Sequence, residues 1–444
     1  MTPTTSLTRS RVWLASLIAV AIAAAAPFAQ TPAPRPQTAA PARAGFSADR
    51  LKRVDALLQR YVDENKLAGA VAMVLRDGQP VYEKAVGWSD KEAGRRMTMD
   101  TIFRIASQTK ALTSTAVLQL MEEGRLSLAD PVSKYVPAFA NTTVSVPGPN
   151  GTSTVVPAKR QITIQDLLTH TAGISYGTEP RIAAAYEPKG LGPAAGRGWY
   201  FADKDDGVCP SIERLATVPF LSQPGEAWVY GYNTDVLGCI VERITGQSLA
   251  EVIKSRITAP LGLTDTQFFL PAAQRTRLAA VYGSGASGTI ERAAEGASGQ
   301  GHYVDGPRRS FSGGAGLLST AHDYARFLEA MRLSGALDGA RILSPRAVQL
   351  MTTNQVGTLH STTGLGFGLG FETTDRYGAN GMDSVGSFGW AGAYGSMYRV
   401  DPEARLVIVL MIQLIPNATD IRSAFPTAVY QALVESPVRA PATH

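Results

Sequence analysis

The sequence of 444 residues has few of the residue types that build metal centres or bind nucleic acids. It contains two cysteines and five histidines, and the histidines are dispersed along the chain. This distribution argues against a zinc site, and we expect neither a metal nor another cofactor. The formal net charge is +5, but lysine and arginine are scattered and form no long basic run. A nucleic-acid partner is therefore not expected.

The N-terminal segment lacks acidic residues and has the pattern of an export signal. Arg9 and Arg11 precede a predominantly apolar run at residues 12–26, which is short for a membrane span. We expect residues 1–29 to be a signal peptide, with Ala29 as a candidate cleavage position, and the mature protein to be periplasmic or secreted without a stable membrane span. A retained membrane anchor is the alternative.

The remaining chain divides by composition. Residues 30–45 are rich in proline and alanine and have nothing to bury, which predicts a stiff, solvated linker. Residues 46–435 are the expected folded domain, because 45% apolar content is ample for a core, and residues 436–444 form a tail. In an oxidising compartment Cys209 and Cys239 could pair, but Cys239 lies in an apolar helical run and could equally be a small buried side chain.

Hydrophobic periodicity and turn residues predict a chain that begins with a helix and a hairpin. A helical stripe covers residues 46–65, and two apolar segments within residues 68–88 are joined by Asp77-Gly78, a strong hairpin signal. Two further apolar strands within residues 393–412 flank an Asp-Pro-Glu-Ala turn. The middle of the chain is helical and irregular, and residues 178–208 form either a flap near the site or an ordinary surface loop.

Ser107 and Lys110 stand at the start of an apolar helix that should end near Gly124. Residues three apart share a helix face, so the hydroxyl and the amine can come within hydrogen-bonding reach. A neutral lysine can take the proton of a serine nucleophile, and a helix N-terminus favours a developing oxyanion. Because serine and lysine are common, this pair alone is a weak signal, and its context decides its interpretation.

The segment from Phe103 to Lys110, its apolar helix and the stretch from Glu123 to Val132 resemble the nucleophile region of the serine β-lactamase and penicillin-binding-protein superfamily. The likeness is strongest to the branch of class C β-lactamases, D-amino-acid peptidases and family VIII carboxylesterases, and it spans about residues 46–435. It implies a mixed α/β (α+β) fold, in which an antiparallel sheet is flanked by helices and a helical subdomain is inserted between early and late strands.

The resemblance also implies roles for residues far from Ser107. Tyr230 matches the second catalytic element, whose usual form is Tyr-x-Asn; here Tyr232 occupies the place of the Asn and Asn233 follows it. Family members carry Lys-Thr-Gly, His-x-Gly or Trp-x-Gly on a late strand; no lysine follows Lys254, so Trp390-Ala-Gly392 is the matching version. The backbone N–H of Ala393 would complete an oxyanion hole with that of Ser107, and Tyr232, Asn233, Trp390 and Gly392 would contact the substrate.

These substitutions favour an esterase. An indole in place of a lysine offers an apolar wall where a β-lactam or D-peptide carboxylate would bind. We therefore expect a serine hydrolase that acts on small neutral esters through an acyl-enzyme on Ser107, with Lys110 as base and Tyr230 as proton relay. The alternatives are a β-lactamase or D-amino-acid peptidase or transpeptidase, with Arg308, Arg309 or Arg399 as carboxylate contact, and a non-catalytic penicillin-binding-like sensor.

A second candidate nucleophile is Ser175, since Gly173-Ile-Ser175-Tyr-Gly177 fits the Gly-x-Ser-x-Gly elbow of α/β-hydrolases. That elbow requires a buried strand before the serine and a helix after it. The preceding Leu-Leu-Thr-His-Thr segment does not predict a strand, and Pro180 follows soon. We therefore do not expect Ser175 to be the nucleophile.

Overall fold

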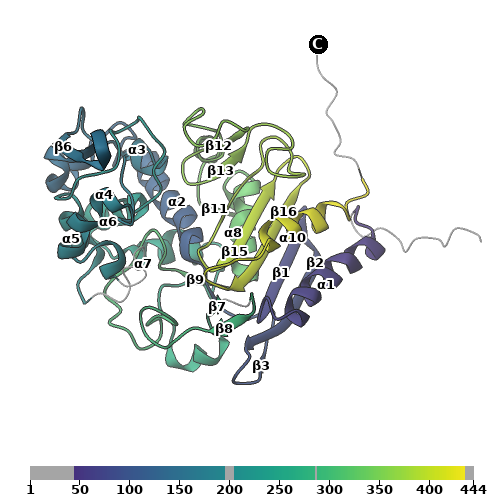
Figure 1. Cartoon of the computed structure of the whole chain (residues 1–444). Coiled ribbons are helices and arrows are strands. Elements are labelled where there is room, and N and C mark those ends of the chain that lie inside the picture. Colours follow the sequence, from purple (N-terminus) through teal and green to yellow (C-terminus); the bar gives the residue numbers. More distant parts are fainter. Residues whose placement is uncertain (1–44, 196–204, 286–287, 436–444) are drawn as a thin grey trace, which may run out of the picture. The chain divides into compact units, whose positions relative to one another are not determined.

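The computed structural model describes residues 45–195, 205–285 and 288–435, and its central element in these residues is an eight-stranded sheet (Figure 1). The strand order is β12-β13-β14-β15-β16-β1-β2-β3, and every neighbouring pair is antiparallel. The strands are β1 (Gly69–Arg76), β2 (Gln79–Asp90), β3 (Arg95–Arg96), β12 (Leu365–Phe367), β13 (Glu372–Thr374), β14 (Phe388–Ala391), β15 (Gly395–Asp401) and β16 (Leu406–Gln413).

Both predicted hairpins are confirmed, and they lie side by side at the centre of this sheet. Asp77 and Gly78 connect β1 to β2 with φ angles of 51° and 73°, the left-handed conformations that a tight two-residue hairpin turn requires. β1 pairs with β16 in a register that places Val71 opposite Met411. The first and last strands of the domain are therefore neighbours, and the chain between them forms the rest of the molecule.

Helices cover both faces of the sheet, as the alternation along β1 shows. Ala72 and Val74 pack in one core with α1 (Ala48–Asp63) and α10 (Ile421–Tyr430). Val71 and Met73 point to the opposite face and belong to the core that contains α8 (Ala321–Arg332). Successive side chains of a strand point to opposite faces, so the sheet is sandwiched between these helices.

The helical subdomain lies between β3 and the late strands in sequence. Its central helix, α2 (Thr109–Glu122), is buried on nearly every side and contacts α6 and α7, as expected for a helix in the middle of a core. The other elements are α3 (Ile164–Leu168), α4 (Pro180–Tyr186), α5 (Val208–Leu215), α6 (Asn233–Thr245), α7 (Leu249–Ile253) and the hairpin of β5 (Thr143–Pro147) and β6 (Ser153–Pro157). The predicted fold class is confirmed.

Small elements connect these layers. They are the strand pairs β4 (Phe103–Arg104) with β9 (Leu318–Ser319), β7 (Tyr282–Ser284) with β8 (Ile290–Arg292) and β10 (Ala336–Leu337) with β11 (Ala340–Arg341), and helix α9 (Pro345–Met351). A π-helical turn, η7 (Lys254–Thr258), directly follows α7.

The structure pairs the two cysteines and leaves most of the predicted terminal segments outside the described residues. Cys209 in α5 and Cys239 in α6 form a disulfide, so of the two alternatives for these cysteines the structure has the pair. The expected signal peptide, the linker apart from Gly45, and the tail lie outside the described residues, as does part of the predicted flap, residues 196–204. Among the helices that are described, none combines the length and hydropathy of a membrane span.

Candidate active site

Ser107 is held at a sharp corner between a strand and a buried helix. The short strand β4 is fixed by Gln413 of β16, whose side chain accepts from Arg104 N (3.1 Å) and donates to Arg104 O (3.0 Å). The chain then turns through Ala106, which has a φ of 44°, an uncommon conformation for a residue with a Cβ. Such local strain often marks functional positions. The corner leads into a 3₁₀ turn (Ala106–Gln108) and then into α2.

Lys110 lies one turn into this region with its ammonium beside the serine hydroxyl. The Nζ atom donates to Ser107 Oγ (3.3 Å), to Tyr176 Oη (3.1 Å) and to the carbonyl of Gly314 (2.8 Å). The Lys110 side chain is almost fully buried, with 2% of its surface exposed. The predicted proximity of the Ser107 and Lys110 side chains is confirmed.

Asp235 supports the carbonyl that Lys110 contacts. Its Oδ1 atom accepts from Gly314 N (3.1 Å) and from Ser312 Oγ (2.6 Å). A Cβ on residue 314 would lie 2.4 Å from Asp235 Oδ2, so glycine is required for this close approach. Burial raises the pKa of Asp235 to about 6, although Ser312 and Lys110 oppose this rise.

Two tyrosines enclose the ammonium of Lys110. Tyr230 presents its ring to Nζ at 4.6 Å from the ring centre, a cation–π distance, and its hydroxyl accepts a hydrogen bond from Trp390 Nε1 (3.1 Å). The hydroxyl bonded to Lys110 is that of Tyr176. Burial, together with Tyr230 and Asp235, raises the pKa of Tyr176 well above its usual value, so this phenol is neutral and can donate a proton.

Sequence reasoning missed Tyr176. The residue lies in the loop after α3, directly after Ser175 in the Gly-x-Ser-x-Gly stretch, where attention falls on the serine. No periodic pattern marks a loop residue, and its contact with Lys110 joins positions 66 residues apart. The available signal was an aromatic residue with an ionisable hydroxyl in the loop that follows the Leu-Leu-Thr-His-Thr segment.

Aromatic side chains form a wall beside Tyr230. Trp390 of β14 and Trp228 have ring centres 5.4 and 5.6 Å from that of Tyr230. Phe367 lies behind both indoles, at 5.5 Å from each. His360 packs edge-on against Trp228 at 4.5 Å and is hydrogen-bonded to Glu372 (3.0 Å). Of these residues only Trp390 was predicted, and the wall confers an apolar surface on the site.

Gly392 and Ala393 follow β14 and lie against the Ser107 corner. A Cβ on residue 392 would be 2.6 Å from the carbonyl oxygen of Ile105, so only glycine allows this approach. Ala393 packs in the same small apolar cluster as Ala106. The structure therefore places Gly392 against Ile105 and Ala393 against Ala106, which both precede Ser107 in the chain, and the oxyanion hole of Ser107 and Ala393 stays a prediction.

Tyr232 and Asn233 do not reach the open side of the site, which corrects the prediction that they contact the substrate. Both side chains are fully buried. Asn233 Nδ2 bonds to His170 Nδ1 (2.9 Å) and to the carbonyls of Ile174 and Val229, each at 3.2 Å. The Tyr232 hydroxyl accepts from Gly192 N (3.2 Å), and its ring packs edge-on against Tyr176 at 4.9 Å. The two residues support the site from behind.

Ser175 is also structural. It is fully buried, and its hydroxyl donates to Glu179 Oε2 (2.7 Å) and accepts from Gly177 N (2.9 Å). The residues before it form a turn after α3 and contain no strand. In the described part of the chain, no three His, Cys, Asp or Glu side chains gather in a way that could hold a metal ion.

The fold is that of β-lactamases and penicillin-binding proteins, and comparisons of sequence agree. The model of the Beta-lactamase family matches residues 54–430. The chain is 35% identical to the Mycobacterium tuberculosis (strain H37Rv) protein Rv1367c, over 82% of this chain and 90% of that protein. It is 33% identical to esterase EstB of Burkholderia gladioli, over 81% and 89% of the two chains.

A solved structure extends this agreement. EstCE1, described as a hydrolase with promiscuous acyltransferase activity, superposes with a TM-score of 0.73 at 26% identity and covers 87% of this chain and 98% of its own. The chain thus belongs to the beta-lactamase family and is a β-lactamase-fold serine hydrolase.

Proposed function

We propose that this protein is an exported carboxylesterase that cleaves small neutral esters through an acyl-enzyme on Ser107. The observation that carries the proposal is the 3.3 Å contact between Lys110 Nζ and Ser107 Oγ at a buried corner. In the neutral form of Lys110, Nζ accepts the hydroxyl proton as Oγ bonds to the ester carbonyl carbon. The alkoxide leaves with a proton that returns through Tyr176 or Tyr230, the phenols beside Lys110. Water then repeats the sequence on the acyl-enzyme and releases the acid.

The oxyanion that forms at the carbonyl is assigned to the backbone N–H groups of Ser107 and Ala393. The close approach of Gly392, next to Ala393, to Ile105, two residues before Ser107, supports this assignment. Ser107 lies in the 3₁₀ turn (Ala106–Gln108) that leads directly into α2, and unpaired N–H groups at a helix start favour negative charge.

Lactam and D-peptide substrates carry a carboxylate, which a cation would bind. Among its described residues the aromatic wall has no cation suited to this, which supports a preference for neutral esters. Trp390 occupies the motif position, and its N–H is already bonded to Tyr230. Arg399 is within 3.2 Å of Asp383 and 3.6 Å of Glu372, so its charge is balanced. Arg308 donates to backbone carbonyls of Leu270 and Val304 in a different pocket, and Arg309 is exposed.

The similarity to proteins named esterase EstB and to the hydrolase EstCE1 supports the same class of substrate. Export to the periplasm or outside the cell is proposed from residues 1–29, in which Arg9 and Arg11 precede the apolar run. The substrate is accordingly a small ester met outside the cytoplasm.

The decisive experiment compares hydrolysis of p-nitrophenyl acetate and butyrate with hydrolysis of nitrocefin. Ser107→Ala should lose ester turnover by at least about 10³-fold, since removal of a nucleophile typically costs this much or more. Ser175→Ala is the matched control and should keep it if folded, which thermal unfolding checks. Nitrocefin turnover well above ester turnover would move the assignment to a β-lactamase. Loss of activity in Ser175→Ala but not in Ser107→Ala would contradict the proposed site.

A further inference from the structure

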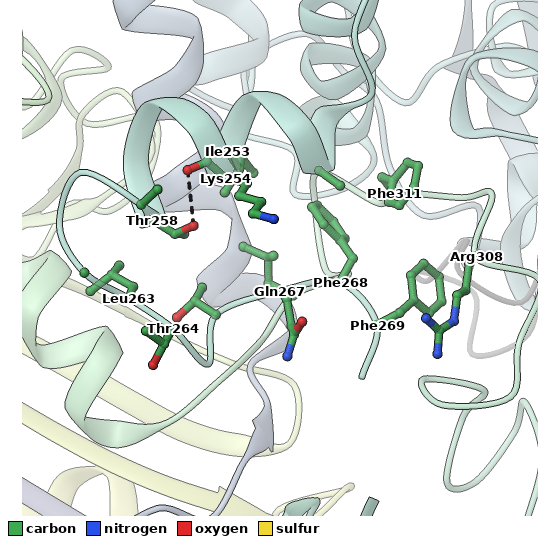
Figure 2. A pocket seen from close by; sticks show the side chains of 15 residues that line it. Ile253, Lys254, Thr258, Leu263, Thr264, Gln267, Phe268, Phe269, Arg308 and Phe311 are labelled. Carbon is green, nitrogen blue, oxygen red and sulfur yellow. Dashed lines mark hydrogen bonds between the residues drawn. The ribbon is translucent and has the colours of Figure 1, made fainter. Parts of the chain in front are cut away.

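A second pocket, with a volume of about 580 Å³, lies between the π-helical turn η7, residues 262–269 and residues 308–317 (Figure 2). Its size falls in the range of small-molecule sites. The lining residues, all in the described part of the chain, do not include Ser107, Lys110, Tyr176, Tyr230 or Trp390. The pocket is therefore distinct from the candidate active site, although one chain segment, residues 314–317, contributes to both.

The inner walls of this pocket are apolar and aromatic. Phe311 packs edge-on against Phe268 and Phe269, with ring centres 5.4 and 6.0 Å apart. The aliphatic side chains of Ile253, Leu263 and Leu317 complete these walls. Such a surface is suited to a hydrocarbon chain, whose burial against apolar side chains is favourable.

The charges that line the pocket are all positive within the described residues. Lys254 and Arg308 contribute, and neither Asp nor Glu does. Arg308 is anchored, because its Nη2 donates to the carbonyls of Leu270 (2.7 Å) and Val304 (3.0 Å). Lys254 differs: Figure 2 shows its side chain extending from the helix over the pocket toward Phe268. Among the residues that the structure describes, no hydrogen bond or ion pair holds the Lys254 ammonium.

The π-helical turn η7 brings Lys254 and Thr258 to the wall of the pocket. Ala259 N bonds to Lys254 O (2.9 Å), five residues back, instead of four as in an α-helix. π-helical turns are rare in proteins, and many of those that do occur lie at functional sites. Here Lys254, Thr258 and Ala259 of this wider turn all line the pocket.

We propose that this pocket binds a small amphipathic carboxylate of the medium-chain fatty-acid class. The hydrocarbon chain lies against the phenylalanine rings, and the carboxylate pairs with the ammonium of Lys254. Charge complementarity selects this occupant over a neutral lipid or a cation. The inference does not depend on the reaction at Ser107.

Isothermal titration calorimetry of the full chain with octanoate, and with octan-1-ol as the uncharged analogue, tests the proposal. Lys254→Met should weaken octanoate binding about threefold or more, as expected for an exposed ion pair, and leave octan-1-ol binding unchanged. Lys189→Met, at an exposed lysine outside the pocket, is the matched control and should have no effect.

A second variant tests the pocket by volume. Ala250 lines it near the start of α7, so Ala250→Trp should fill it and abolish binding of both ligands. If that variant fails to fold, the comparison of Lys254→Met with Lys189→Met decides. Absence of octanoate binding to the wild type, or equal affinity for wild type and Lys254→Met, would overturn the proposal.

Discussion

The ammonium of Lys110 lies 3.1 Å from the hydroxyl oxygen of Tyr176, closer than the 3.3 Å that separates it from Ser107 Oγ. The same ammonium faces the ring of Tyr230 and not its hydroxyl, which accepts from Trp390. The phenol in direct contact with the proposed base is thus the one supplied by the loop after α3. This arrangement favours Tyr176 as the proton relay, a role that its position in the sequence did not indicate.

We therefore predict that Tyr176→Phe lowers kcat for p-nitrophenyl butyrate by about 10²-fold with little change in KM. The variant keeps the ring but removes the hydroxyl that contacts Lys110, the proposed base. General acid–base groups typically contribute a rate factor of about 10² or more. Steady-state kinetics of the two constants checks this.

Two further tyrosine variants complete that test. Tyr377→Phe, at a side chain with 67% of its surface exposed, should match the wild type. Tyr230→Phe removes the acceptor of Trp390 Nε1. Full kcat in Tyr176→Phe together with a loss in Tyr230→Phe would assign the relay to Tyr230 alone and leave Tyr176 a packing role.

What could be predicted from the sequence was mostly local. Asp77-Gly78 determines its own turn, and Ser107 and Lys110 meet because they lie within one turn of the same corner. The likeness to the family added the antiparallel sheet and the position of Trp390. These features depend on neighbours in the chain or on motifs with fixed spacing, so one sequence suffices to find them.

Features decided by distant contacts were not predictable in the same way. Asn233 was predicted to contact the substrate because it follows a tyrosine motif. Its side-chain amide is instead hydrogen-bonded to His170, 63 residues earlier in the chain. Cys209 and Cys239 pair because α5 packs against α6, which periodicity alone does not reveal. In the aromatic wall, Trp228 contacts His360 and Phe367, which lie far from it in the sequence.

Trp390 should determine selectivity for the acyl chain. If its indole contacts the acyl group, Trp390→Ala should lower the ratio of kcat/KM for butyrate to that for acetate by about tenfold. The two additional CH₂ groups of butyrate are each worth about 0.8 kcal/mol when buried. Trp390→Phe keeps an aromatic surface but loses the bond to Tyr230, and should change the ratio less. An unchanged ratio in Trp390→Ala would mean that the acyl chain lies elsewhere.

Asp235 should give the stability of the protein a distinct dependence on pH. Burial raises its pKa to about 6 from an ordinary value near 3.8, so the folded state holds the proton more tightly than the unfolded state. The stability from this group is fully present below about pH 4 and is lost as pH rises through about 6. Above that pH a buried charge remains.

Asp235→Asn removes this charge and keeps an acceptor for Ser312 and Gly314. We expect the free energy of unfolding of the variant, relative to that of the wild type, to be about 2 kcal/mol higher at pH 8 than at pH 4, from the size of the shift. Urea unfolding at both pH values measures it. Asp63→Asn, at an exposed position on α1, reports the effect of losing one negative charge. A relative stability of Asp235→Asn that does not change with pH would contradict the assignment.

The disulfide between Cys209 and Cys239 should stabilise the helical subdomain. It closes a loop with a sequence separation of 30 residues, and the loss of loop entropy in the unfolded chain corresponds to about 3.6 kcal/mol. Titration of thiols in denaturant should find none before reduction and two after it, since these are the two cysteines of the sequence. Cys209→Ser with Cys239→Ser should lower the free energy of unfolding by a similar amount, and dithiothreitol should destabilise the wild type but not this variant. Equal sensitivity of both proteins to dithiothreitol would exclude the disulfide as the cause.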